Sequence, residues 1–206
     1  TTVASTSVGI SPIAQARFTI DGAPGDASAE KDHHTPERAV HLFASDTYDV
    51  LEEHLSRSLP RPAFGENIVA NGISDDAIFV GDHLRVGTAL LVVTQPTERC
   101  KAIGRSLGFP KILKALHQLE VCGFYARVEI PGEITVGDAV FLEHRFEPAW
   151  SVKRLHRAMF KHHADEELIS EVMALANLSS EWKARLDVMR GRAKRGEPMS
   201  SNLVDL

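Results

Sequence analysis

The chain has 206 residues, 43% of them hydrophobic and 25% charged, which is ordinary for a globular protein with a single core and at most a small additional domain. Its formal net charge of −5 argues against general nucleic-acid binding, which needs a basic surface. Because no apolar run approaches the roughly 18 residues of a membrane span, no signal-peptide pattern opens the chain and two cysteines cannot form a disulfide framework, we expect a cytoplasmic protein without a membrane partner.

The first third of the chain predicts a loop, a short strand and a helix. Residues 22–37 are polar and contain Gly and Pro, which favours a loop, and a short strand is expected over 38–43. Residues 47–55 predict a helix, because apolar side chains recur at spacings of three and four. Ser45 or Asp46 is a candidate cap for this helix.

Residues 60–145 contain most of the expected strands, separated by Gly-Asp and Pro-Gly turns. The segments with this pattern are 78–80, 84–86, 89–94, 124–130 and 139–145. Short strands with such turns favour an antiparallel or mixed β-barrel. A helix is expected within 104–119, where Ile112, Leu116 and Leu119 are spaced by four and three.

After Pro148 the pattern changes to three amphipathic stripes at helical spacing. The stripes are Val152, Leu155 and Met159, then Leu168, Val172 and Leu175, and finally Trp182, Leu186 and Met189, with Ser179 as a candidate cap. The core of so small a bundle is marginal, so we expect it to pack against the barrel. The predicted organisation is a β-barrel domain over 1–147, a three-helix domain over 148–195 and a tail over 196–206.

Cys100 is the most informative single residue. It follows the strand predicted over 89–94 and stands between Arg99 and Lys101. Neighbouring cations favour the thiolate, the form that binds soft or high-valent metals and attacks electrophiles. The residues alone leave a functional and a structural role for Cys100 open, whereas Cys122 is expected to be a small packing residue. The chain contains no HExxH, CxxC, GxSxG, Walker or GxGxxG motif.

An ordered set of motifs resembles a known family. The segments RPAFGENI (61–68), VGDHLRVGTALLVVTQPTERC (80–100) and GFYARVEIPGEITVGD (123–138) resemble the MOSC domain in order and spacing. The segment AEKDHHTPERAVHLF (29–43) is similar to a loop of the bacterial YiiM type. The resemblance covers roughly residues 8–195. It implies a mainly β fold, namely a MOSC β-barrel with peripheral helices plus a small C-terminal three-helix domain.

The resemblance implies a binding site for the molybdenum cofactor (Mo-molybdopterin). Carried over from the family, Cys100 is the metal ligand and the catalytic residue. Arginine makes bidentate phosphate contacts, and amide side chains match the donor and acceptor edges of a pterin. The positions that match the family's cofactor-binding residues are Arg17, His33, Arg38, Asn67, Thr94 and Gln95.

The implied activity is reduction of small N-hydroxylated molecules, such as hydroxylaminopurine-type bases. The chain has no flavin or iron–sulfur motif, so electrons are expected from a separate reductase, a flavoprotein. A homodimer is compatible with the sequence. Two alternatives stay open: a persulfide or cofactor carrier that acts with a desulfurase, and a MOSC scaffold that binds no cofactor.

Two short segments depart from the family pattern. Where the family has His-Gly-Gly, this chain has His33-His34-Thr35, and the Cβ atoms of the last two hinder a tight backbone or a close cofactor approach. Where the family has Arg after Gln-Pro and Pro before the cysteine, this chain has Thr97 and Arg99. These departures leave open whether cofactor binding or substrate choice is altered.

Overall fold

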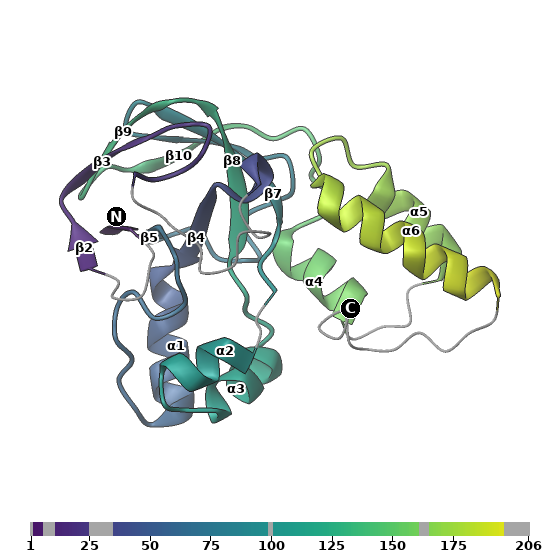
Figure 1. Ribbon diagram of the computed structural model, residues 1–206, viewed down its shortest axis with the longest axis horizontal. Coiled ribbons are helices and arrows are strands. Elements are labelled where there is room, and N and C mark those ends of the chain that lie inside the picture. Colours follow the sequence, from purple (N-terminus) through teal and green to yellow (C-terminus); the bar gives the residue numbers. More distant parts are fainter. Residues whose placement is uncertain (1, 6–10, 25–34, 99–100, 161–164, 196–206) are drawn as a thin grey trace.

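The computed structural model describes residues 2–5, 11–24, 35–98, 101–160 and 165–195. A curled β-sheet forms the main body, three helices lie together below it, and the last three helices extend to one side (Figure 1). The mainly β prediction with peripheral helices and a C-terminal helical domain is confirmed. No helix in the described part of the chain is long and apolar enough to cross a membrane.

The strands form an eight-stranded sheet with the order β10-β6-β7-β8-β4-β5-β1-β2 and a two-stranded sheet of β3 and β9. The β4–β5 pair is parallel, whereas the other described pairs are antiparallel. The strand bounds are β1 Thr2–Ser5, β2 Ser11–Ile13, β3 Gln15–Phe18, β4 Val40–Ala44, β5 Ile68–Ala70, β6 His83–Val86, β7 Ala89–Pro96, β8 Phe124–Ile130, β9 Gly132–Thr135 and β10 Val140–His144.

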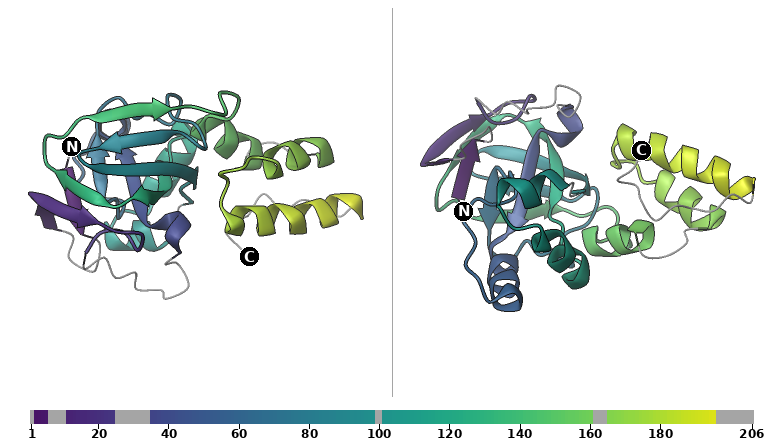
Figure 2. Two further views of the ribbon diagram at one scale, coloured as in Figure 1. Left: turned by 90° about the horizontal axis from the view of Figure 1, so that it is seen from above. Right: turned by 60° about the horizontal axis from the view of Figure 1, so that its bottom comes forward.

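The helices fall into two groups, α1–α3 below the sheet and α4–α6 beside it (Figures 1 and 2). Helix α1 connects β4 to β5, as a parallel strand pair requires a crossover. We call α4–α6 the three-helix domain. The helix bounds are η2 Pro36–Arg38 (a 3-10 helix), α1 Ser45–Leu55, α2 Lys101–Ser106, α3 Lys111–Leu119, α4 Val152–Phe160, α5 Glu166–Met173 and α6 Ser180–Lys194.

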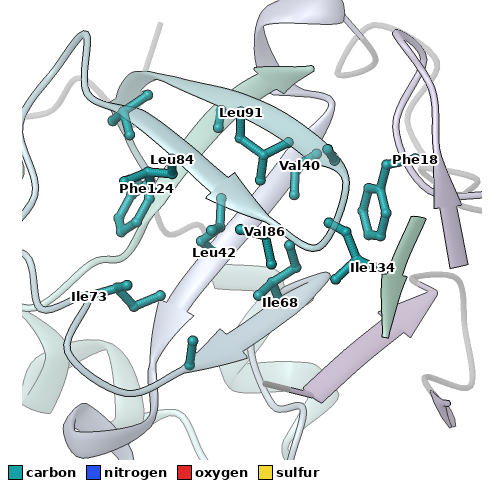
Figure 3. Packing of buried hydrophobic residues seen from close by; sticks show 14 of the residues in the cluster. Phe18, Val40, Leu42, Ile68, Ile73, Leu84, Val86, Leu91, Phe124 and Ile134 are labelled. Carbon is teal, nitrogen blue, oxygen red and sulfur yellow. The ribbon is translucent and has the colours of Figure 1, made fainter. Parts of the chain in front are cut away.

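The barrel interior is filled by aliphatic and aromatic side chains from both sheets (Figure 3). Along β8, Phe124, Ala126 and Val128 are buried in this core, while Tyr125 and Arg127 alternate with them and are half-buried. Because successive side chains of a strand point to opposite faces, Tyr125 and Arg127 lie on the outer face of the barrel.

The three-helix domain has its own core, and its first residue also belongs to the barrel. Val80 of the barrel packs with the apolar residues of α4–α6. Val152, at the start of α4, is fully buried in the barrel core, and its amide donates to the carbonyl of Ile78 at 2.9 Å. Side-chain packing therefore crosses the predicted domain boundary between residues 147 and 148. The position of that boundary stays a prediction.

Several predicted elements differ from those observed. The strand over 78–80 is a single bridge between Phe79 and Ser151, because its partner is the chain that enters α4. The helix expected within 104–119 is confirmed as α3, which contains Ile112, Leu116 and Leu119, whereas α2 was not predicted and ends before Gly108, which adopts a left-handed conformation.

The first residues of β4 and α1 differ from the prediction, whereas the N-cap of α6 confirms it. The strand over 38–43 begins two residues later, because Arg38 belongs to η2. Helix α1 begins at Ser45 after Ala44, so neither Ser45 nor Asp46 is the N-cap. Ser179 is confirmed as the cap of α6 and accepts a hydrogen bond from the backbone amide of its third residue.

Candidate functional site

Three of the predicted site residues, Arg38, Thr94 and Gln95, lie close together where β7 ends. The Thr94 hydroxyl is 2.6 Å from the carbonyl oxygen of Glu37 and 3.0 Å from that of Tyr125. The pairing of β7 with β8 shifts register at this point, as expected of a bulge that redirects a side chain. Thr94 therefore joins β7 both to β8 and to the η2 segment that carries Arg38.

Arg38 places a fixed positive charge on the outer face of β8. Its guanidinium lies 4.7 Å from the centre of the Tyr125 ring and 3.4 Å from the Tyr125 hydroxyl, and it pairs with Glu181 of α6 at 3.1 Å. Burial lowers the pKa of Arg38, but Tyr125 and Glu181 outweigh this effect and raise the pKa above its ordinary value. The charge of Arg38 is thus permanent.

The outer face at the ends of β4, β8 and β7 forms a nearly buried polar surface. Tyr125 pairs with His41 on one side and with Gln95 on the other, and the His41 and Tyr125 rings are 5.2 Å apart. Thr97 continues the ladder, since its amide donates to the carbonyl of Gly123 at 3.0 Å. It lies two residues after Gln95 and so shares its face. We call His41, Tyr125, Gln95 and Thr97 the site face.

Two oxygens on the site face are buried without a hydrogen-bond partner. Gln95 is 2% exposed and Thr97 is 1% exposed, and Gln95 Oε1 and Thr97 Oγ1 have no partner among the residues that the structure describes. Most buried polar atoms in proteins are hydrogen-bonded. A bound group with N–H or O–H donors would satisfy both oxygens, and the nearby Arg38 would complement an anionic part of it. The residues present therefore fit a polar, anionic cofactor such as a pterin phosphate.

Asn67 and Arg17 occupy different surroundings. The Asn67 side-chain oxygen accepts from the His41 amide at 2.7 Å, and the Asn67 amide donates to the His41 carbonyl at 2.8 Å. Asn67 thus fixes the β4 residue of the site face, while a direct cofactor contact stays a prediction. Arg17 is exposed on β3, opposite Glu133 of β9, and no described contact brings it to the other predicted residues.

The remaining predicted residues, Cys100 and His33, lie outside the described residues, as do His34 and Arg99. Their roles stay predictions. On one side the chain is described as far as Glu98, two positions before Cys100 and directly after Thr97, and on the other side α2 begins at Lys101. The structure therefore places Glu98 at the end of β7.

Glu98 connects this segment to the three-helix domain. It is half-buried and forms an ion pair with Arg185 of α6, whose other terminal nitrogen donates to Glu181 at 2.7 Å. Burial raises the pKa of Glu98, and Arg185 opposes that shift only in part. Glu98 Oε1 is a further buried oxygen without a partner in the described part of the chain.

The first residues of α6 also contact the barrel next to the site face. The Ser179 amide donates to the carbonyl of Thr94 at 3.2 Å. The Ser180 amide donates to the Glu37 carboxylate at 2.9 Å, and a carboxylate at a helix N-terminus is favourable. The described residues contain no group of three or more His, Cys, Asp or Glu side chains that could hold a metal ion.

Comparison with known proteins agrees with this architecture. Residues 29–141 match the MOSC domain, and residues 150–186 match the YiiM-like, 3-alpha helix domain. The chain belongs to the MOSC domain family. Its MOSC domain thus carries every described residue of the site face, and the YiiM-like helical domain carries Ser179, Glu181 and Arg185.

Relatives of this MOSC protein include three with informative coverage. The uncharacterized protein YflK of Bacillus subtilis is 30% identical over 78% of this chain and 73% of its own length. A Gibberella moniliformis protein named Reductase is 30% identical over 89% of this chain, but the match spans only 33% of that protein. The solved structure of YiiM from Escherichia coli superposes with a TM-score of 0.80 at 20% identity and covers 98% of this chain and 96% of that one, which shows the fold alone.

Sequence reasoning missed the carboxylates and the aromatic residues of this MOSC site. Glu98 and Arg185 are 87 positions apart, and local patterns do not show that they meet. The spacing of Glu181 and Arg185 on one helix was the available signal, because residues four apart are neighbours on a helix surface. Tyr125 and His41 gave no signal beyond their place in predicted strands.

Proposed function

We propose that this MOSC protein is a molybdenum-cofactor-dependent reductase of small N-hydroxylated molecules. The observation that carries the proposal is the pair of buried oxygens of Gln95 and Thr97 beside the fixed charge of Arg38, at the strand end that leads into Cys100. The family likeness supplies the cofactor, and the fungal relative named Reductase supports the reaction type. That relative's whole activity belongs to a protein of which only a third is matched here.

Arg38, Gln95, Thr97 and Cys100 would hold the cofactor. Arg38 would complement the cofactor phosphate, and Gln95 and Thr97 would accept hydrogen bonds from the pterin edge. Cys100 would bind molybdenum as a thiolate, the ligand type that suits a soft or high-valent metal. When bound, the cofactor supplies two-electron redox chemistry. Next to the site face, η2 and α6 contact Thr94 through the carbonyl of Glu37 and the amide of Ser179.

The overall reaction consumes two electrons and two protons. The N–O bond of the substrate breaks, the oxygen leaves as water, and the nitrogen becomes an amine. We infer that the electrons come from a separate flavoprotein reductase, because the sequence carries no iron–sulfur or flavin motif of its own. A hydroxylaminopurine-type base is the substrate class that we propose.

The test is Cys100→Ser, with Cys122→Ser as the matched control. Both proteins are purified from molybdenum-replete cells, and molybdenum and pterin per chain are measured, followed by conversion of a hydroxylaminopurine to the aminopurine with reduced methyl viologen as the donor. We expect Cys100→Ser to lose at least about tenfold in molybdenum content and activity, because a hydroxyl is a harder and far less acidic ligand than a thiol. Cys122 is buried in the barrel core, so Cys122→Ser should keep both.

Wild-type protein without molybdenum or pterin would contradict the proposal. Sulfane sulfur on Cys100 in such a protein would indicate instead a persulfide carrier. Full activity of Cys100→Ser would remove the metal-ligand assignment.

A further inference from the structure

A chain of ion pairs runs from the end of β7 to η2 through helix α6. Arg185 uses one terminal nitrogen for Glu98 and the other for Glu181, and Glu181 pairs in turn with Arg38 at 3.1 Å. Glu98 stands two positions before Cys100 in the sequence. One guanidinium thus connects the segment that leads into Cys100 with the element that carries Arg38.

The Arg185 contacts differ in kind from ordinary surface ion pairs. The side chains of Arg185, Glu98 and Glu181 are 25%, 20% and 28% exposed, so water screens their charges only in part. A guanidinium is a rigid planar fork of donors and can join two carboxylates at once, which an ammonium group does less well. Among the residues that the structure describes, Arg190 on the same helix pairs only within α6, with Asp187, which is 61% exposed.

Helix α6 is itself fixed to the barrel, independently of Arg185. The Ser179 amide is bonded to the Thr94 carbonyl, and the Ser180 amide to the Glu37 carboxylate. Arg185 lies less than two turns further along the helix. Its position relative to β7 is therefore set by the docking of α6 and not by Glu98 alone.

We propose that Arg185 is a positioning residue for the candidate site. Through Glu98 it holds the end of β7 from which the chain runs to Cys100, and through Glu181 it holds Arg38. The three-helix domain then acts as part of the scaffold of the site, not as an appended module. The inference rests on the proposed function for the roles of Cys100 and Arg38, while the ion-pair geometry stands on its own.

The experiment measures how fast iodoacetamide alkylates Cys100 in the full chain, by quantitative peptide mass spectrometry. The variants are Arg185→Gln and Glu98→Gln, the control is Arg190→Gln, and buried Cys122 is the internal reference for unfolding. Loss of either partner releases the same segment, so we expect both variants to accelerate Cys100 alkylation by about threefold or more. Arg190→Gln should react like wild type, and the double variant should react like the single ones, because both substitutions break one contact.

The Arg185→Gln and Glu98→Gln variants together distinguish a positioning effect from a simple effect of charge on the Cys100 thiol. Loss of the Arg185 cation would disfavour the thiolate and slow the reaction, whereas loss of the Glu98 anion would favour it. Changes of opposite direction, or wild-type rates in both variants, would overturn the proposal. If Arg185→Gln does not fold, Glu98→Gln and Glu181→Gln decide the question from the other ends of the contact. Molybdenum content is measured in the same samples, so that a wild type without metal counts against the proposed function alone.

Discussion

At the scale of single residues, Asp75 organises the start of the strand that carries Tyr125. Asp75 is 5% exposed, and its carboxylate accepts hydrogen bonds from the amides of Cys122 at 2.7 Å and Gly123 at 3.1 Å. Its own carbonyl accepts from the Lys153 amide at 2.8 Å. One residue therefore ties the beginning of β8 to the beginning of α4.

We predict that Asp75→Ala lowers the free energy of unfolding by about 2–4 kcal/mol, because two buried amides lose a charged acceptor and each unsatisfied group costs about 1–3 kcal/mol. The measurement is urea denaturation followed by circular dichroism. The neighbouring Asp76 pairs with Lys153 and is 68% exposed, so Asp76→Ala is the control and should change stability by less than about 1 kcal/mol. Equal effects of the two substitutions would contradict the role given to Asp75.

The residues of the site were predictable to the extent that they stand in ordered motifs. Thr94 and Gln95 stand at the end of an apolar run that predicts a buried strand, and Arg38 follows a loop with a family-like pattern. Glu98 and Glu181 could not be predicted, because their importance depends on how α6 docks, and docking is decided by tertiary packing. Asn67 was predicted as a cofactor contact, and the structure adds that it holds the backbone of His41.

At the scale of elements, the N-terminus of α6 is held both by its own cap and by a carboxylate from η2. Ser179 accepts a hydrogen bond from the Trp182 amide at 3.2 Å, and Glu37 accepts one from the Ser180 amide. The first contact lies within the helix, whereas the second crosses from the barrel to the three-helix domain. Salt should therefore weaken the contact of the charged Glu37 and leave the contact of the neutral Ser179 unchanged.

We predict that Ser179→Ala and Glu37→Gln each cost about 1 kcal/mol of unfolding free energy at low salt. In 1 M NaCl the cost of Glu37→Gln should fall by at least half, since ions screen the interaction of a charge with a helix dipole. The cost of Ser179→Ala should not change, because its hydrogen bond is between neutral groups. Chemical denaturation by urea at both salt concentrations measures the two effects. Equal salt dependence would show that Glu37 does not act through its charge.

The elements that sequence patterns predicted well are those whose burial alternates or runs continuously. Strands β7 and β8 and the three stripes of α4–α6 belong to this group. Short strands such as β3 and β5 were missed because so few residues carry no period, whereas the segment 84–86 was predicted and is confirmed as β6. The segment around Phe79 looked like a strand, yet its partner lies 72 positions later at Ser151, which no local pattern reveals.

At the scale of the whole molecule, the barrel depends on the first turn of α4. A chain cut after Pro148 loses Val152 from the barrel core, and with it the bridge between Phe79 and Ser151. We predict that this truncated protein is destabilised by at least about 2 kcal/mol relative to one cut after Phe160, since removal of a buried aliphatic side chain leaves a cavity. Urea denaturation and the soluble yield of both truncated proteins provide the comparison. Equal stability would show that the barrel is complete without α4.

The strand order of the large sheet also determines when the molecule can be completed during its synthesis. Strand β4 lies between β5, which is made soon after it, and β8, which begins 80 positions after β4 ends. A nascent chain that has left the ribosome only as far as β7 therefore carries β4 with one edge unpaired, and open strand edges invite association with other chains. β8 covers that edge, and α6 follows β8 in the chain. The helix that pairs with Glu98 and Arg38 therefore leaves the ribosome only after the strand that covers this edge of β4.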